Sequence, residues 1–481
     1  MLTYSMQDAA NTPKYLFLYQ RIRNDIIAGR IEDGERLPSK RALAQHLGVG
    51  LITVANAYDL LVSEGYATAV ERRGYFARVS PTRSRNMKAP HEAKPAASDA
   101  ANESGLGASS KPHGSEIHTD LRANRTSMRL FPAATWNRLI RKTITQGSAL
   151  FDVVPYNGLE ALRVAIADYL RESRNMQVNP EHIVIGAGTE YLYGRLTQLL
   201  GHTRIFGFED PGYKKLSTIC HYSGCESRFI PIDKEGIRMD LLEASDVDII
   251  HVSPANQFPM GSHMSVRRRA DLLAWANRSS KRYVVEDDYD SEFRYRGGYL
   301  PPLFVQDKND RVIYLNTFSK TLVPSLRISY MVLPPALMER YRESLSFYSC
   351  TVSSFEQLTL AQFISQGYFE RHINRLRTYY RKQRSRVIKA IGASPLSAIS
   401  RIIEHNAGTH LLLQVDTSLA PSEIRAAAET VSLNLSLYVD YTTGSKDNIP
   451  KYLVINYAAI EPDEIEPAIV ALASMFPECK D

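Results

Sequence analysis

The sequence predicts an α/β protein with two domains, an N-terminal winged helix-turn-helix and a large domain built on a mostly parallel sheet. The chain has 481 residues, which is too long for one ordinary domain. Residues 80–118 are rich in Ala, Ser, Pro, Gly and Lys and almost lack large apolar side chains, so we expect a flexible linker there. Beyond it, short β-branched runs alternate with longer amphipathic stretches. We therefore place a small helical domain at residues 1–79 and the larger domain at residues 119–481.

The small domain begins with two helices. Leu18, Ile22 and Ile26 recur at four-residue spacing, which gives the first helix one buried face, and Gly29 is expected to end it. Ser39 is expected to cap a second helix that runs to about residue 46.

A third helix and a basic hairpin follow. A turn at Gly48-Val49-Gly50 precedes a helix expected at residues 51–64, and residues 66–79 are predicted to form a hairpin that turns at Arg72-Arg73-Gly74. Helix, turn, helix and basic β-wing is the arrangement that sets one helix into the major groove of DNA. The small domain is therefore predicted to bind double-stranded operator DNA.

The large domain is predicted to be a sheet covered by helices. Amphipathic stretches at residues 158–174 and 266–279 indicate helices. Strands are expected at six β-branched runs, Ile183–Ile185, Arg204–Phe208, Val247–Val252, Tyr283–Val285, Val312–Leu315 and Ile328–Leu333. Strands separated by helices favour a mostly parallel sheet.

The most informative segment is YLNTFSKTLVPSLRISY, at residues 314–330. It places Lys320 after a strand, close to the hydroxyls of Thr317 and Ser319 and to Arg327. A lysine that forms an imine with an aldehyde cofactor needs nearby anchors for the cofactor's phosphate, and hydroxyls and a guanidinium supply them. Upstream, VVEDDYDSEF at residues 284–293 places carboxylates at a strand end, where one can pair with a protonated pyridine nitrogen.

These motifs resemble a known family. LPSKRALAQHLGV, the following NAY and EGY and the wing RRGYF resemble the GntR superfamily, while EDDYDSEF with TFSKTLVPSLRISY resembles its MocR/GabR-type regulators. The resemblance covers residues 14–79 and 119–481. It implies a winged helix-turn-helix fused to a fold-type I aminotransferase-like domain with a smaller C-terminal α+β subdomain, a head-to-tail homodimer, and pyridoxal 5'-phosphate (PLP) as cofactor.

The resemblance also implies roles for individual residues. Lys320 is the Schiff-base lysine, Asp287 the partner of the pyridine nitrogen, Tyr289 a donor to the ring's phenolic oxygen and Tyr213 a residue stacked on the ring. The phosphate is expected at Gly188, Thr189, Glu190, Thr317, Ser319 and Arg327. DNA contacts are expected from Arg36, Lys40, Arg41, Thr53, Asn56, Arg72 and Arg73.

Three departures from the family patterns qualify these roles. Many GntR proteins carry V-S-R before the Thr-Val of the third helix, where this chain has Val49-Gly50-Leu51. Aminotransferases commonly carry Asn-Pro-x-Gly, where this chain has Phe258 at the Asn position, so that Asn256 or Gln257 would have to compensate. Val454 stands where a carboxylate-binding Arg is typical.

The last two departures favour a regulator that senses PLP, or an amino acid or amine through PLP, over the alternative of an active aminotransferase with an accessory DNA-binding domain. The intact set of cofactor residues argues against a vestigial site. The opening MLTY, LITVANAY and GAGTEYLYG look most similar to regulators of vitamin B6 synthesis and salvage, so PLP itself is the expected effector.

Composition excludes several other classes. No run of eighteen apolar residues and no secretory signal is present, which predicts a cytoplasmic protein without a membrane partner. Four cysteines in so long a chain form no disulfide framework, and no Cys or His motif predicts a metal site. The net charge of +6 permits nucleic-acid binding without requiring it.

Overall fold

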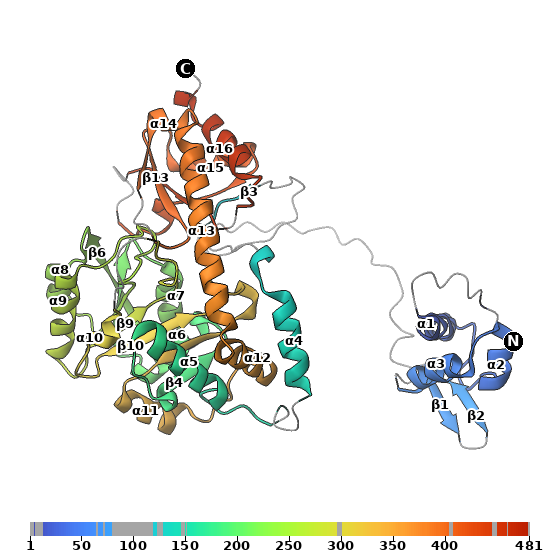
Figure 1. Cartoon of the computed structure of the whole chain (residues 1–481). Coiled ribbons are helices and arrows are strands. Elements are labelled where there is room, and N and C mark those ends of the chain that lie inside the picture. The colour runs from blue at the N-terminus through green and yellow to red at the C-terminus, as the bar shows by residue number, and fades with distance from the viewer. Residues whose placement is uncertain are drawn as a thin grey trace, which may run out of the picture. The chain divides into compact units, whose positions relative to one another are not determined.

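The chain folds as two compact units, Met1–Ser110 and Lys111–Asp481, in a computed structural model (Figure 1). The structure describes Tyr4 and residues 13–63, 66–70, 73–78, 119–122, 128–145, 150, 152–295, 301–403, 407–444, 450–458 and 460–479. The predicted linker at residues 80–118 lies outside the described residues, so the domain boundaries stay a prediction.

The first unit has the three helices and the hairpin that the sequence predicts. Its elements are α1 (Lys14–Ile27), α2 (Lys40–Leu47), α3 (Leu51–Ser63), β1 (Ala67–Val70) and β2 (Gly74–Ala77). Leu18, Ile22 and Ile26 are all buried, as their spacing predicts. The Ser39 hydroxyl accepts a hydrogen bond from the Ala42 amide at 3.2 Å, which caps α2.

The second unit is built on an eight-stranded sheet of order β4-β11-β10-β9-β8-β5-β6-β7. The sheet is mostly parallel, as predicted: β10, β9, β8, β5 and β6 pair in parallel, whereas β11 and β7 run against their neighbours. Its strands are β4 (Ile183–Gly186), β5 (Ile205–Asp210), β6 (Glu226–Asp233), β7 (Gly236–Ile237), β8 (Ile249–Val252), β9 (Tyr283–Asp287), β10 (Val312–Thr317) and β11 (Ser329–Val332). All six predicted strands are present, and β6 is one that the sequence analysis missed.

Helices cover this sheet, and three apolar clusters lie between the helices and the strands. They are α4 (Ala133–Ile144), α5 (Glu160–Arg174), α6 (Thr189–Leu200), α7 (Lys214–Tyr222), α8 (Met239–Ala244), α9 (Val266–Asn277), α10 (Leu303–Gln306), α11 (Pro335–Leu345) and α12 (Ser354–Ser365). Among the described residues, no helix is both long and apolar enough to cross a membrane.

A smaller subdomain completes the second unit. Its antiparallel sheet has the order β12-β13-β16-β15 (Ser400–Ile403, Leu411–Val415, Tyr452–Ile455 and Ser436–Leu437), and β3 (Thr119–Asp120) pairs separately with β14 (Leu433–Asn434). Helices α14 (Leu396–Ile399), α15 (Pro421–Thr430) and α16 (Ile465–Ser474) complete it. The 25-residue helix α13 (Tyr368–Gly392) runs from the large sheet layer to this subdomain (Figure 1).

Candidate functional site

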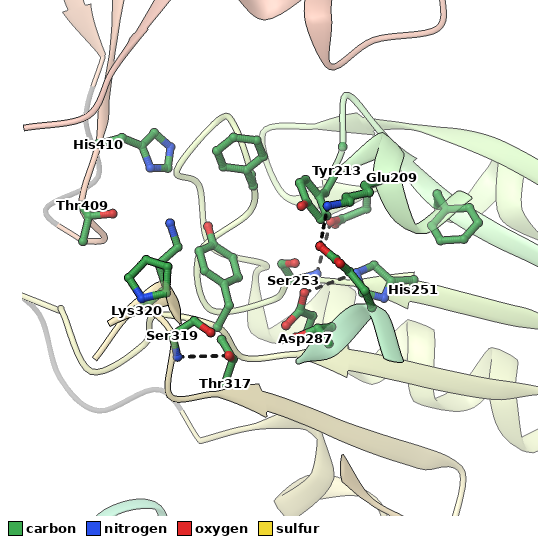
Figure 2. A pocket seen from close by; sticks show the side chains of 18 of the residues that line it. Glu209, Tyr213, His251, Ser253, Asp287, Thr317, Ser319, Lys320, Thr409 and His410 are labelled. Carbon is green, nitrogen blue, oxygen red and sulfur yellow. Dashed lines mark hydrogen bonds and ion pairs between the residues drawn. The ribbon is translucent and has the colours of Figure 1, made fainter. Parts of the chain in front are cut away.

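A cavity of about 320 Å³ opens where the parallel strands of the large sheet end. Ligand sites in open α/β sheets form at the carboxyl ends of strands, and β9 and β10 end here at Asp287 and Thr317. Figure 2 shows Lys320 with Thr409 and His410 on one side and Asp287 and His251 on the other. The structure brings together nine residues that the sequence analysis assigned to a cofactor, Thr189, Glu190, Tyr213, Asp287, Tyr289, Thr317, Ser319, Lys320 and Arg327.

Lys320 faces a buried carboxylate. Burial lowers the pKa of Lys320, and the charge of Asp290 opposes that shift. Both Asp290 oxygens accept hydrogen bonds from the Asn256 amide nitrogen, at 2.9 and 2.8 Å. A lowered lysine pKa enlarges the neutral fraction of the amine, which is the form that attacks an aldehyde.

Asn256 also positions Tyr289. The Tyr289 hydroxyl donates to the Asn256 carbonyl at 2.9 Å, and the Asn256 side-chain nitrogen lies 3.3 Å from the same hydroxyl. Gln257 instead donates to the Pro211 carbonyl at 2.7 Å. Of the two residues suggested to compensate for Phe258, Asn256 is therefore the one that contacts the predicted cofactor residues.

Asp287 lies against a neutral histidine. Burial, and then the charge of Asp288, raises the pKa of Asp287 to about 7. His251 Nε2 lies 3.7 Å from the Asp287 carboxylate, but burial lowers the pKa of His251 to about 3, so the two do not form an ion pair at neutral pH. His251 Nδ1 is buried without a hydrogen-bond partner among the described residues. A cation brought to Asp287 would restore its charge, because an opposite charge favours the ionised form.

At the N-terminus of α6, beside the cavity, a tight backbone turn lies against the guanidinium of Arg327. Gly188 precedes α6 with φ +95°, and a Cβ there would lie 2.4 Å from Arg327 Nη2. Arg327 itself has φ +50°, an uncommon conformation for a residue with a side chain. It lies 3.4 Å from Glu190, which also pairs with Lys215 at 2.5 Å. A helix N-terminus with a guanidinium fits a phosphate, which would compete with Glu190 for Arg327.

The remaining wall is aromatic and apolar. The Phe258 ring packs against three rings, with centroid distances of 6.5 Å to Tyr213, 5.3 Å to His410 and 4.8 Å to Tyr441. Phe258 also packs against Leu412 and Val454, a buried pair on β13 and β16. The two departures noted in the sequence, Phe258 and Val454, thus belong to one apolar cluster.

Thr409 and His410 are lining residues that the sequence analysis missed. Burial lowers the pKa of His410 to about 4, so its ring is neutral at pH 7. Among the described lining residues, Arg327 is the only arginine. The other described cations of the lining are Lys215 and Lys320, so the residues of the aromatic wall itself include no cation.

In the first unit, the side chains predicted to contact DNA differ in how exposed they are. Arg36, Arg41 and Asn56 are exposed. Lys40 is half-buried, because its ammonium pairs with Asp59 at 3.2 Å and lies 4.8 Å from the centre of the Tyr75 ring. Thr53 is half-buried, Arg73 lies over the Phe76 ring at 5.9 Å, and Arg72 falls outside the described residues.

The start of α3 exposes two apolar side chains. Leu51 is 46% exposed and Ile52 is 76% exposed. Neither residue has a role predicted from the sequence, although Leu51 departs from the family pattern. In a major groove, apolar side chains contact the methyl group of thymine.

Comparison with known proteins identifies the family that each unit resembles. A family model described as "Aminotransferase class I and II" matches residues 119–472, and one described as "Bacterial regulatory proteins, gntR family" matches residues 14–76. The chain is 36% identical to the uncharacterized HTH-type transcriptional regulator YhdI of Bacillus subtilis, over 99% of this chain and 98% of that protein. It is 30% identical to the probable rhizopine catabolism regulatory protein MocR of Rhizobium meliloti, over 97% and 94% of the two chains.

Two further similarities bear on function and on fold. The HTH-type pyridoxine biosynthesis transcriptional regulator PdxR of Corynebacterium glutamicum is 31% identical over 83% of each chain. A solved multiple substrate aminotransferase from Thermococcus profundus has a TM-score of 0.67 at 23% identity, and the match covers 76% of this chain and 93% of that one. At that identity the likeness concerns the fold alone.

Proposed function

The chain belongs to the MocR-type subfamily of gntR-family bacterial regulators, which join a helix-turn-helix domain to an aminotransferase class I and II domain, and from this membership we propose a transcription regulator whose binding to operator DNA is controlled by PLP. The aminotransferase family is PLP-dependent. That PLP binds this chain, and that it acts as the effector, are proposals that rest on the cavity around Lys320.

The donors that line the cavity fit PLP. Lys320 would attach the cofactor and Asp287 would hold the ring nitrogen. Tyr289 would donate to the ring oxygen in place of the Asn256 carbonyl. Tyr213 would cover the ring face, and the phosphate would lie at the N-terminus of α6 with Gly188, Thr189, Thr317, Ser319 and Arg327. Glu190 would contribute its backbone amide, because its carboxylate repels a phosphate. When bound, PLP supplies an aldehyde carbon for covalent attachment and a ring that withdraws electrons.

One observation supports PLP itself as the effector: Phe258, which lines the cavity, belongs to an apolar cluster with Leu412 and Val454. An amino acid bound there would bring a carboxylate into a wall without a cation among its described residues. Burying an unpaired carboxylate costs several kcal/mol. The similarity to a pyridoxine biosynthesis regulator supports vitamin B6 genes as the targets.

Titration of DNA binding tests this proposal. The probe is the intergenic DNA beside the chain's own gene, bound by cofactor-free protein, by PLP-loaded protein, and by loaded protein with a panel of amino acids and amines. If PLP binds one arrangement of the protein more tightly than another by about 1–3 kcal/mol, adding PLP should shift the occupancy of the operator 5- to 150-fold. Equal binding with and without PLP, together with a response to one amino acid or amine only, would overturn the proposal.

The intact lysine and its partners keep an active aminotransferase as the second candidate. Steady-state turnover with amino-acid and keto-acid pairs separates the two candidates. We expect turnover to be absent or very slow, because no guanidinium among the described lining residues is placed to orient the substrate carboxylate at the apolar wall. Rapid turnover with an ordinary amino acid would favour the enzyme.

The DNA surface has its own test in the full-length protein. Arg41→Ala should weaken binding to all duplexes, and Asn56→Ala should relax sequence preference, because arginine suits phosphates and asparagine can hydrogen-bond adenine through two atoms. If neither change alters a gel shift, the assigned surface is wrong. The predicted homodimer is checked by light scattering of the same samples.

A further inference from the structure

The long helix α13 is unusually basic. Its 25 residues, YFERHINRLRTYYRKQRSRVIKAIG, include a single carboxylate, Glu370. Against it stand eight arginine and lysine residues, Arg371, Arg375, Arg377, Arg381, Lys382, Arg384, Arg386 and Lys389. The proposed function uses none of them.

Five of these cations form a straight row, which we call the basic row: Arg371, Arg375, Lys382, Arg386 and Lys389. At about 100° per residue they fall within an arc of about 60° on the helix surface. All five are exposed, and the buried residues of α13, such as Leu376 and Val387, lie on another side. With a rise of about 1.5 Å per residue, the row is about 27 Å long.

The basic row has no carboxylate partner in the part of the chain that the structure describes. Its hydrogen bonds go to neutral acceptors: Arg371 donates to the Gly367 and Gln366 carbonyls, and Arg375 to the His372 ring. Arg386 lies 3.5 Å from the Gln383 side-chain oxygen. Like charges three or four residues apart destabilise a helix. The basic row therefore destabilises the isolated helix, and an anionic partner would offset this repulsion.

A second helix extends the same positive surface. Arg138 of α4 donates to the Tyr368 hydroxyl at 2.7 Å, at the start of α13. Arg138 and Arg371 both lie over the Tyr368 ring, at 5.2 and 4.5 Å from its centre. Helix α4 carries two more exposed cations, Arg141 and Lys142, and no carboxylate.

We propose that the basic row binds the phosphate backbone of duplex DNA, so that the aminotransferase-like unit adds sequence-independent affinity to that of the winged helix-turn-helix. A row of about 27 Å spans about eight base pairs of a duplex at a rise of 3.4 Å each, so its cations can meet phosphates of the two strands that border a groove. The inference rests on the proposed function, which makes DNA the polyanion that this chain meets. It requires no particular placement of the first unit.

Counterion release provides the test. The full-length, PLP-loaded protein and its triple variant Lys382→Gln, Arg386→Gln, Lys389→Gln are titrated onto a labelled mixed-sequence duplex of about four helical turns between about 50 and 200 mM salt. Each lost phosphate contact reduces the slope of log K against log salt by about 0.9, so the variant's slope should fall by about 2 to 3. Its affinity near 0.1 M salt should fall roughly tenfold or more.

A matched control removes the same charge elsewhere in the same unit. Lys281→Gln, Lys308→Gln and Arg340→Gln replace three exposed cations outside α13. This control should keep the wild-type slope to within about one contact. Tryptophan fluorescence and PLP absorbance of both triple variants should match the wild type, which shows that the fold is kept.

Four results would overturn the inference. Equal losses in both triple variants would mean that only net charge matters. An unchanged slope in the α13 variant, with binding weakened by Arg41→Gln, would place all phosphate contacts in the first unit and leave the proposed function standing. A changed mass of the α13 variant in light scattering would make the row a contact between subunits. Failure of the wild type to bind this mixed-sequence duplex would overturn the inference alone, because the proposed function concerns operator DNA and has its own test.

Discussion

Replacing Asp287 by asparagine should stabilise the cofactor-free protein in a way that depends on pH. Burial raises the pKa of Asp287 from 3.8 to about 7. Between about pH 4 and 7 the folded protein therefore holds a proton that the unfolded chain has released, and stability falls as the pH rises through this window. At about 1.4 kcal/mol per pKa unit, the raised pKa of Asp287 lowers the stability of the folded state by about 4 kcal/mol at pH 8 and by about 2 kcal/mol at pH 5, relative to a carboxyl with an unshifted pKa.

Asp287→Asn removes this cost. The variant's gain in the free energy of unfolding over wild type should thus be about 2–3 kcal/mol larger at pH 8 than at pH 5. Urea unfolding followed by tryptophan fluorescence measures this in the second unit alone, because Trp136 and Trp275 are the chain's two tryptophans and both lie there. The exposed Asp152→Asn makes the same charge change as a control. An equal gain at the two pH values would refute a buried, weakly ionised Asp287.

Three further predictions concern the two sites. Lys320→Ala should abolish borohydride trapping of PLP while far-ultraviolet circular dichroism stays unchanged, and equal trapping would place the attachment elsewhere. Gly188→Ala should raise the Kd for PLP at least tenfold in a fluorescence titration, roughly 1.4 kcal/mol, because the new Cβ would lie 2.4 Å from Arg327 Nη2 at φ +95°. An unchanged Kd would show that the guanidinium moves aside without loss. Uracil in place of thymine in a selected operator should weaken binding by the wild type, because the methyl contact is lost. The Leu51→Ala, Ile52→Ala variant should bind both operators equally, because it already lacks that contact. Equal weakening of both proteins would contradict the contact.

Much of the fold was predictable because its strands are continuous buried runs. The four residues of β8 and the six of β10 are all buried, so their β-branched composition was a sufficient signal. Strand β6 escaped because only Ile230 within it is buried and Pro231 interrupts its pattern. Side-chain partners were harder to predict, because the pairing of Lys40 with Asp59 depends on the packing of α2 against α3.

Most of the predicted cofactor residues lie together because they end or follow a strand of one sheet or begin the next helix, whereas Arg327 lies just before β11. Thr409 and His410 could not be predicted in the same way, because they precede a strand of the smaller subdomain and reach the cavity only through the docking of that subdomain. The sequence left open whether Asn256 or Gln257 compensates for Phe258. The contacts of Asn256 with Asp290 and Tyr289 could not be predicted, because they form only where a loop 33 to 34 residues further along the chain packs against Asn256.

The first turns of helix α13 contact the loop that carries Lys320. His372 Nε2 lies 2.7 Å from the Thr321 carbonyl, next to Lys320 in the chain, and the Arg377 guanidinium donates to the Glu292 carbonyl at 3.0 Å. A helix of 25 residues is a rod of about 37 Å, so a tilt of about 3° imposed at its first turns carries its far end about 2 Å. A small displacement of the loop around Lys320 would therefore be amplified along α13 into a larger displacement of the helix end in the smaller subdomain.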